Sequence, residues 1–172
     1  MHINIEFKAK SNNHEQIRNI LKENNADYKG RDHQIDTYFQ VKKGRLKLRQ
    51  GNIENSLIYY ERSDDDQPKQ SDVYLYRLKS EESDSLKQVL AASLGIKVII
   101  DKQREIYFIE NVKFHIDTVK ELGTFIEVEA IDEDGSIGKD KLIKQCDYYK
   151  NLFDVQKSDL ISVSYSDLLL DK

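Results

Sequence analysis

The sequence contains one cysteine, one proline, no tryptophan and no long apolar run. With only Cys146, the chain cannot form an intrachain disulfide or a zinc site built from several cysteines, and it fits a reducing cytoplasm. The longest aliphatic stretch, residues 98–100, is far too short to cross a bilayer. No apolar segment follows Met1, so neither a signal peptide nor membrane association is expected. We therefore expect a cytoplasmic protein.

The chain also lacks a strong excess of charge of either sign. It has 27 Lys and Arg against 31 Asp and Glu, a net charge of −4. Because nucleic-acid-binding proteins normally carry a basic excess, no nucleic-acid partner is expected. Charge of both signs is nevertheless abundant: charged residues make up 34% of the chain, against about a quarter in an average domain. These charges must either cover the surface or line a wet cavity.

The pattern of apolar residues predicts an α+β protein in which strands outnumber helices. Alternation at every second position predicts strands at residues 3–8, 28–48 with a turn at 43–44, 57–62, 73–78, 96–105, 106–117 with a break near 111, and 124–130. Helical spacing predicts helices at about 14–26, 86–94, 142–149 and 166–170. Most connections are too short for crossover helices, which favours antiparallel pairing. The polar stretch 63–72 is expected to be a loop, and residues 1–172 are expected to form one domain.

Charged side chains recur at every second position of the predicted strands. The pairs are Glu6 with Lys8, Lys47 with Arg49, Lys102 with Arg104, His115 with Asp117, and Glu127 with Glu129. Residues two apart lie on the same face of a strand. On any single strand, this pattern is typical of a solvated sheet face. Its recurrence on five strands, with basic and acidic pairs on different strands, instead favours a shared lumen.

Such a lumen would require counter-charges, because like charges crowded together repel. An anion held by the basic rows and a divalent cation held by the carboxylates would relieve both repulsions. A complex of a polyphosphate with Mg²⁺ or Mn²⁺ supplies both species. The sequence has no glycine-rich phosphate-binding loop, so side-chain charge would have to hold the phosphates.

Several short motifs, in order along nearly the whole chain, resemble the CYTH superfamily, which includes class IV adenylyl cyclases and thiamine triphosphatases. Residues 4–8 (NIEFK) resemble the signature E-x-E-x-K, with Asn4 in place of its first glutamate. Residues 34–39 (QIDTYF), 44–49 (GRLKLR), 102–104 (KQR), 115–117 (HID), 122–129 (LGTFIEVE) and 164–169 (SYSDLL) are similar to motifs of the class IV cyclase branch.

The resemblance implies a closed eight-stranded antiparallel β-barrel, a triphosphate tunnel, with flanking helices. It also implies roles for individual residues. The implied triphosphate ligands are Lys8, Lys47, Arg49, Lys102 and Arg104, with Arg62 in a less direct match. The implied ligands of Mg²⁺ or Mn²⁺ are Glu6, Glu127, Glu129 and the neutral Asn4. The implied catalytic residues are Lys8, Arg104 and Asp117, of which Asp117 would assist in placing the metal or the substrate.

The sequence leaves three functions open. A cyclase would convert ATP to cyclic AMP and pyrophosphate. A triphosphatase would hydrolyse thiamine triphosphate, a nucleoside triphosphate or inorganic tripolyphosphate in the same tunnel. A non-catalytic module would only bind a nucleotide or polyphosphate, an alternative suggested by the missing charge at Asn4. His115 is either a general base or a polar neighbour in the barrel. A homodimer is among the assemblies left open.

Overall fold

The structure is a computed structural model that describes residues 2–62 and 69–172, with side chains for residues 2–61 and 72–172. Its strands are β1 (Ile3–Lys10), β2 (Asp27–Phe39), β3 (Arg45–Gln50), β4 (Asn55–Arg62), β5 (Lys69–Arg77), β6 (Ile96–Ile109), β7 (Val112–Val119), β8 (Gly123–Asp132) and β9 (Leu160–Ile161). Its helices are α1 (His14–Glu23), α2 (Ser83–Leu94), α3 (Lys139–Leu152) and α4 (Tyr165–Leu170), with short 3-10 turns η1 (Ser80–Glu82) and η2 (Lys157–Asp159).

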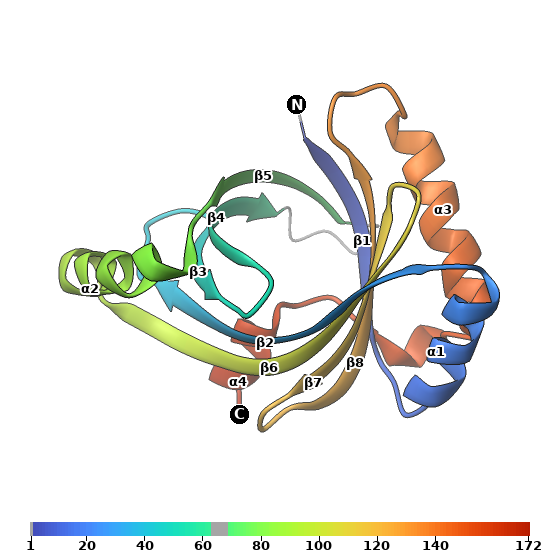
Figure 1. Ribbon diagram of the computed structural model, residues 1–172, viewed down its shortest axis with the longest axis horizontal. Helices are drawn as coiled ribbons and strands as arrows, with labels where there is room; N and C mark the ends of the chain where they lie inside the picture. The colour runs from blue at the N-terminus through green and yellow to red at the C-terminus, as the bar shows by residue number, and fades with distance from the viewer. Residues whose placement is uncertain (1, 63–68) are drawn as a thin grey trace.

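Strands β1 to β8 form one antiparallel sheet that closes on itself (Figure 1). The order is β5-β4-β3-β2-β6-β7-β8-β1, and closure comes from pairing of β1 with β5, where Glu6 lies opposite Lys69. Further along β1, the short strand β9 pairs with Lys8 and Ala9. The predicted eight-stranded antiparallel barrel with flanking helices is thus confirmed in the described part of the chain.

Two predicted boundaries are wrong. β6 continues through residues 105 and 106 to Ile109, and the turn falls at Glu110 and Asn111, where Glu110 has φ +51°. The alternation of β6 does not stop at residue 105, because both of its neighbours, β2 and β7, continue to pair with it there. Residues 69–72, predicted as loop, belong to β5 because they pair with β1. That partner is distant in sequence, so the local composition could not reveal it; Pro68 lies outside the described residues.

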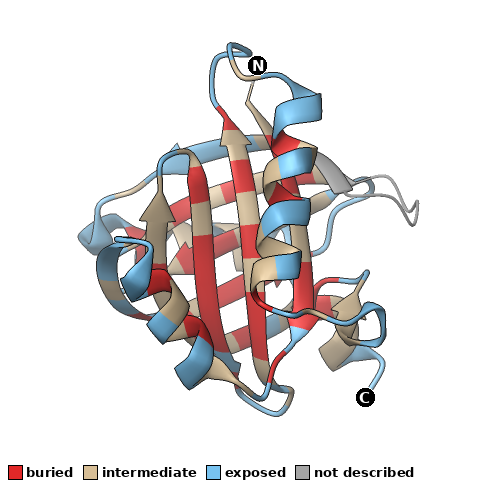
Figure 2. Ribbon diagram, turned by 90° about the vertical axis from the view of Figure 1, so that its right-hand side faces the viewer, coloured by how far each residue is buried: buried red, intermediate tan, exposed pale blue. Residues whose placement is uncertain are grey.

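The main hydrophobic core lies outside the barrel, between the sheet and two helices. Ile17 and Leu21 of α1, with Leu142 of α3, pack against the outward-facing side chains of β1, β7 and β8. Figures 1 and 2 show α1 and α3 on this side of the barrel. Burial of each such aliphatic side chain contributes about 1.5–3 kcal/mol. Because alternate residues face opposite ways, burial of the apolar faces under helices directs the polar faces of these strands into the lumen.

The C-terminal helix α4 packs at one end of the barrel against a second apolar cluster, which includes Tyr38, Ile100 and Phe125. Ser164 caps the helix: its Oγ accepts from the Asp167 backbone N–H at 3.2 Å, and the Asp167 carboxylate accepts from the Ser164 backbone N–H at 3.1 Å. This capping box fixes the chain direction just before Tyr165. The first residue of α4 is therefore held against the lumen.

Helix α2 projects away from the barrel on the side opposite α1 and α3 (Figure 1). It ends at Leu94, and the following Gly95 has a φ of +81°, which favours glycine. Among the residues that the structure describes, no helix has the length and apolar character needed to span a membrane.

Candidate active site

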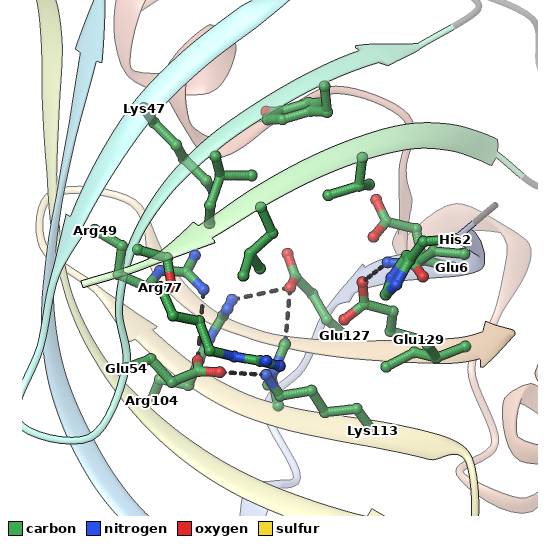
Figure 3. Close-up of a pocket in the computed structure, with 18 of the residues that line it drawn as sticks. His2, Glu6, Lys47, Arg49, Glu54, Arg77, Arg104, Lys113, Glu127 and Glu129 are labelled. Carbon is green, nitrogen blue, oxygen red and sulfur yellow. Dashed lines mark hydrogen bonds and ion pairs between the residues drawn. The ribbon is translucent and has the colours of Figure 1, made fainter. Parts of the chain in front are cut away.

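The barrel encloses a cavity of ≈ 420 Å³ whose wall is rich in charge of both signs. Its charged wall residues are Lys8, Lys47, Arg49, Arg77, Lys102, Arg104 and Lys113, with Glu6, Glu54, Glu127, Glu129 and Glu133. Figure 3 shows Arg49 and Arg104 on one side of this cavity and Glu6 and Glu129 on the other. The basic and acidic rows therefore face a common interior.

One fully buried carboxylate, Asp36 of β2, gathers three of the cations. It accepts hydrogen bonds from Arg49 Nε and Nη2 at 2.9 Å each, from Lys102 Nζ at 2.8 Å and from Lys47 Nζ at 3.1 Å. Burial would raise the pKa of Asp36, but the three cations hold it well below its usual range. One negative charge thus orients three positive charges, which leaves a local surplus available to an anion.

Lys102 of β6 lies deepest in this group. Its side chain is only 2% exposed, and burial lowers its pKa to about 7 despite the attraction of Asp36. The positive charges of Arg104 and Arg49 contribute to this lowering. The carboxylate cannot fully offset the burial because it is shared with two other cations. Lys102 is therefore a cation whose charge depends on pH near neutrality.

Arg104 forms the second charged centre. It donates to Asp117 Oδ1 and Oδ2 at 2.7 and 2.6 Å and to Glu127 Oε2 at 2.9 Å. Asp117 also accepts from the hydroxyl of Tyr165 at 2.7 Å. Burial would raise the pKa of Asp117, but the paired Arg104 lowers it, so the carboxylate stays ionised. This bidentate pair fixes the guanidinium plane in the wall.

The start of α4 closes the wall near Lys8. The ammonium of Lys8 lies 3.1 Å from Glu127 Oε1 and 4.1 Å from the centre of the Tyr165 ring. The Tyr165 side chain is buried and, through its hydroxyl, also holds Asp117. Arg45 joins this segment from β3, since its Nη2 donates to Asp167 Oδ2 at 2.8 Å. The C-terminal segment is therefore part of the cavity wall.

His115 lies on the same wall, and its two ring nitrogens differ in their surroundings. Its Nδ1 lies 3.1 Å from Glu127 Oε2, whereas its buried Nε2 has no hydrogen-bond partner in the part of the chain that the structure describes. Burial would raise the pKa of Glu127, but Lys8, Arg104 and His115 hold it well below its usual range. Burial and Arg104 lower the pKa of His115. A neutral imidazole beside an ionised carboxylate is assigned its proton on Nδ1, which makes Nε2 an acceptor.

The oxygen donors Asn4, Glu6 and Glu129 lie together on β1 and β8. Glu6 and Glu129 are directly opposite in the antiparallel register, and Asn4 Nδ2 donates to Glu129. Asn4 Oδ1 is buried and has no hydrogen-bond partner among the described residues. No group of three His, Cys, Asp or Glu side chains in the described ranges converges as a metal site by itself. Two carboxylates, an unsatisfied amide oxygen and phosphate oxygens would suit Mg²⁺ or Mn²⁺, so these residues fit a hard cation.

Most residues that the sequence singled out line this one cavity. They are Asn4, Glu6, Lys8, Lys47, Arg49, Lys102, Arg104, His115, Glu127 and Glu129. Asp117 lies behind the wall, fully buried, and acts on the cavity through Arg104 and Tyr165. The side chain of Arg62 lies outside the described residues, although its backbone belongs to β4.

Sequence reasoning gave no site role to Asp36, Lys113, Glu54 or Tyr165, nor to Arg77 and Glu133 of the cavity wall. Asp36 belongs to a family motif and alternates with Gln34 and Tyr38 on β2. Lys113 shares the inward face of β7 with His115 and could have been found by the same alternation. Glu54 sits in a turn and Tyr165 after a loop. Strand periodicity says nothing about such positions.

This architecture, a closed antiparallel barrel with opposed basic and acidic rows in its lumen, is the triphosphate-tunnel fold. The chain belongs to the CYTH domain family, whose description matches residues 2–160. No curated protein matches the sequence.

Solved structures with the same fold have low sequence identity. The PH1012 protein of Pyrococcus horikoshii OT3 is 20% identical with a TM-score of 0.79, over 96% of this chain and 98% of that one. A "putative adenylate cyclase" of Vibrio parahaemolyticus is 16% identical with a TM-score of 0.72, over 98% of both chains. HpAC1 of Hippeastrum is described as a "putative adenylyl cyclase" with a dominant triphosphatase activity. It is 12% identical with a TM-score of 0.64, over 99% of this chain and 94% of that one.

Proposed function

We propose that this protein is a divalent-metal-dependent enzyme that acts on a small-molecule triphosphate. The activity that we favour is that of a class IV adenylyl cyclase. The observation that carries the proposal is the convergence of Lys47, Arg49 and Lys102 on one carboxylate at the wall of an enclosed cavity. Three cations on one anion leave a positive surplus, which phosphate oxygens can satisfy.

The charge balance of the cavity supports a metal-bound form of the substrate. Seven described wall residues are Lys or Arg and five are Glu. The buried carboxylates of Asp36 and Asp117, which pair with wall cations, bring the acidic count to seven as well. A free triphosphate would add several uncompensated negative charges to a balanced site. A triphosphate with bound Mg²⁺ or Mn²⁺ would largely retain the balance, and Asn4, Glu6 and Glu129 supply oxygen ligands for it.

In the cyclase reaction, the ribose 3′-oxygen forms a bond to the α-phosphorus, and the bond from that phosphorus to the oxygen bridging the β-phosphate breaks. Lys47, Arg49 and Lys102 would hold the departing pyrophosphate. Arg104, fixed by Asp117, would stabilise charge that develops on the phosphoryl oxygens. A bound divalent cation would polarise the phosphate and help the 3′-hydroxyl lose its proton.

A triphosphatase is the second candidate, and one observation favours it. HpAC1, which shares the fold, is described as having a dominant triphosphatase activity despite its name. In that reaction the oxygen of water would form a bond to the γ-phosphorus, and the bond from that phosphorus to the oxygen bridging the β-phosphate would break, so that a diphosphate leaves and the γ-phosphate becomes orthophosphate. The same cations would hold the triphosphate in both reactions. The position of the attacking oxygen, opposite the α-phosphorus or the γ-phosphorus, therefore decides between the cyclase and the triphosphatase.

Product analysis tests the proposal. Purified protein is incubated with ATP, thiamine triphosphate or tripolyphosphate in Mg²⁺ or Mn²⁺, and cyclic AMP, pyrophosphate and orthophosphate are separated. Cyclic AMP with equimolar pyrophosphate from ATP supports the cyclase, whereas orthophosphate without cyclic AMP supports the triphosphatase. Lys102→Ala should abolish either activity, while Lys22→Ala, at the exposed end of α1, should not. Tight binding with no product from any substrate would show a non-catalytic binding module instead.

A further inference from the structure

The outer part of the cavity differs from the deep part in its chemistry. The deep cation Lys102 is 2% exposed, whereas the side chains of Lys113 and Glu54 are 12% and 27% exposed. Around this outer pair the wall is apolar, with Ile53, Leu78 and Phe108 lining the same cavity. A subsite with apolar walls and one polar pair suits a group other than phosphate.

Glu54 forms a short ion pair with Lys113, joined in Figure 3, and a longer one with Arg49. Glu54 Oε2 accepts from Lys113 Nζ at 2.5 Å, Glu54 Oε1 accepts from Gln34 Nε2 at 3.0 Å, and Arg49 Nη1 lies 3.5 Å from Glu54 Oε1. Lys113 lies 5.7 Å from the centre of the Phe108 ring, its cross-strand partner. Lys113 therefore has a carboxylate partner at short distance that does not belong to the Asp36 group. A carboxylate at this position would also repel phosphate.

The position of Glu54 is fixed by its own turn. The buried carboxylate of Asp32 accepts from the backbone N–H groups of Ile53 and Glu54 at 2.9 and 3.0 Å. Asn55 brackets the turn: its Oδ1 accepts from the Gly51 N–H at 3.2 Å, and its Nδ2 donates to the Gly51 oxygen at 2.9 Å. Leu78 is tied to the same turn by a backbone hydrogen bond to Asn55. The acceptor and its apolar surroundings are thus built into the fold.

We propose that Glu54, Lys113 and Phe108 form a subsite for a planar heterocycle that carries an exocyclic amino group next to a ring nitrogen. The amino group donates to Glu54, the ring nitrogen accepts from Lys113, and the ring lies against Phe108. Adenine and aminopyrimidines have this edge. The inference rests on the proposed function, since the triphosphate of the same substrate occupies the deep cations. It specifies an organic triphosphate and not inorganic tripolyphosphate.

Binding of three probes tests the subsite. ATP, purine riboside triphosphate (ATP with hydrogen in place of the 6-amino group) and tripolyphosphate are titrated calorimetrically in Ca²⁺, and turnover is checked afterwards. The wild type should bind ATP about tenfold more tightly than the analogue, because the analogue lacks the amino group that donates to Glu54. Glu54→Leu should reduce this ratio to near one without weakening tripolyphosphate.

The controls keep the subsite separate from the triphosphate site. Glu23→Leu, an exposed glutamate on α1, should leave the ratio unchanged, and Glu54→Gln provides a shape-matched variant if Glu54→Leu unfolds. Equal affinities for ATP and the analogue in the wild type, or an unchanged ratio in both Glu54 variants, would overturn the subsite alone. Failure of the wild type to bind any of the three probes would overturn the proposed function as well.

Discussion

Lys102 and Asp36 form an ion pair of 2.8 Å between neighbouring strands deep inside the barrel, and the carboxylate of this pair also serves two other cations. Most buried ion pairs match one cation with one anion. Here the deficit of negative charge is part of the structure, and it makes the pair sensitive both to protons and to anionic ligands.

The first prediction concerns proton uptake on ligand binding. Burial lowers the pKa of Lys102 to about 7, so at pH 8 this side chain is largely neutral in the free protein. A bound triphosphate favours the charged form and raises that pKa, so binding should take up a proton. Calorimetry of tripolyphosphate binding at pH 8, in buffers of different ionisation enthalpy, should show about one more proton taken up by wild type than by Lys102→Arg. Equal uptake by the two proteins would contradict the assignment.

The second prediction concerns Asp36. Asp36→Asn removes the carboxylate charge that the three cations share, so we expect the free energy of unfolding to fall by about 3 kcal/mol. A triphosphate can replace the missing charge. Tripolyphosphate should therefore raise the melting temperature of Asp36→Asn more than that of wild type. A smaller ligand-induced shift in the variant would show that Asp36 does not share its partners with the ligand.

The third prediction concerns the neutral Asn4. Asn4→Glu restores the glutamate of the family signature but places a second carboxylate against Glu129. Without metal we expect a loss of stability of about 1 kcal/mol from like-charge repulsion. With Mn²⁺ or Mg²⁺ the stability should recover, and the metal concentration that gives half-maximal activity should fall severalfold. Asn4→Ala should raise that concentration; chelation with EDTA should abolish activity in all three proteins. Unchanged metal dependence in both variants would exclude Asn4 from the metal site.

The fourth prediction concerns acid stability. The pKa values of Asp36, Glu54 and Glu127 are lowered in the folded state by neighbouring cations, which outweigh burial. The unfolded chain therefore binds more protons below about pH 4, and the stability present above that pH is lost as the pH falls through the folded values. His115, whose pKa is lowered by burial, acts in the same direction below about pH 6.5. Urea unfolding at pH 7, 5, 4 and 3 measures this; a free energy of unfolding that is constant from pH 5 to 3 would contradict it.

Strand alternation predicts which charged residues share a face of one strand. Lys47 and Arg49 are predicted to share a face of one strand, and Lys102 and Arg104 a face of another, because residues two apart on a strand face the same way. The same rule placed Glu127 and Glu129. One wrong boundary, between residues 105 and 106, was placed inside a continuous strand, where the alternation of apolar and polar residues gives no sign of a break. The other lay at residues 69–72, where pairing with the distant strand β1 makes a polar stretch part of β5.

By itself, the sequence determined the strand faces, the sign of charge on each strand and the order of the family motifs, because these depend on neighbours a few residues apart. Only the tertiary structure decided that Asp36 holds three cations, that Asp117 lies behind Arg104, and that Glu54 faces Lys113 at the outer end of the cavity. These relationships depend on strand register around a closed barrel and on turns anchored by buried groups. Residues far apart in the chain meet there, and no local pattern in the sequence records the distance between them.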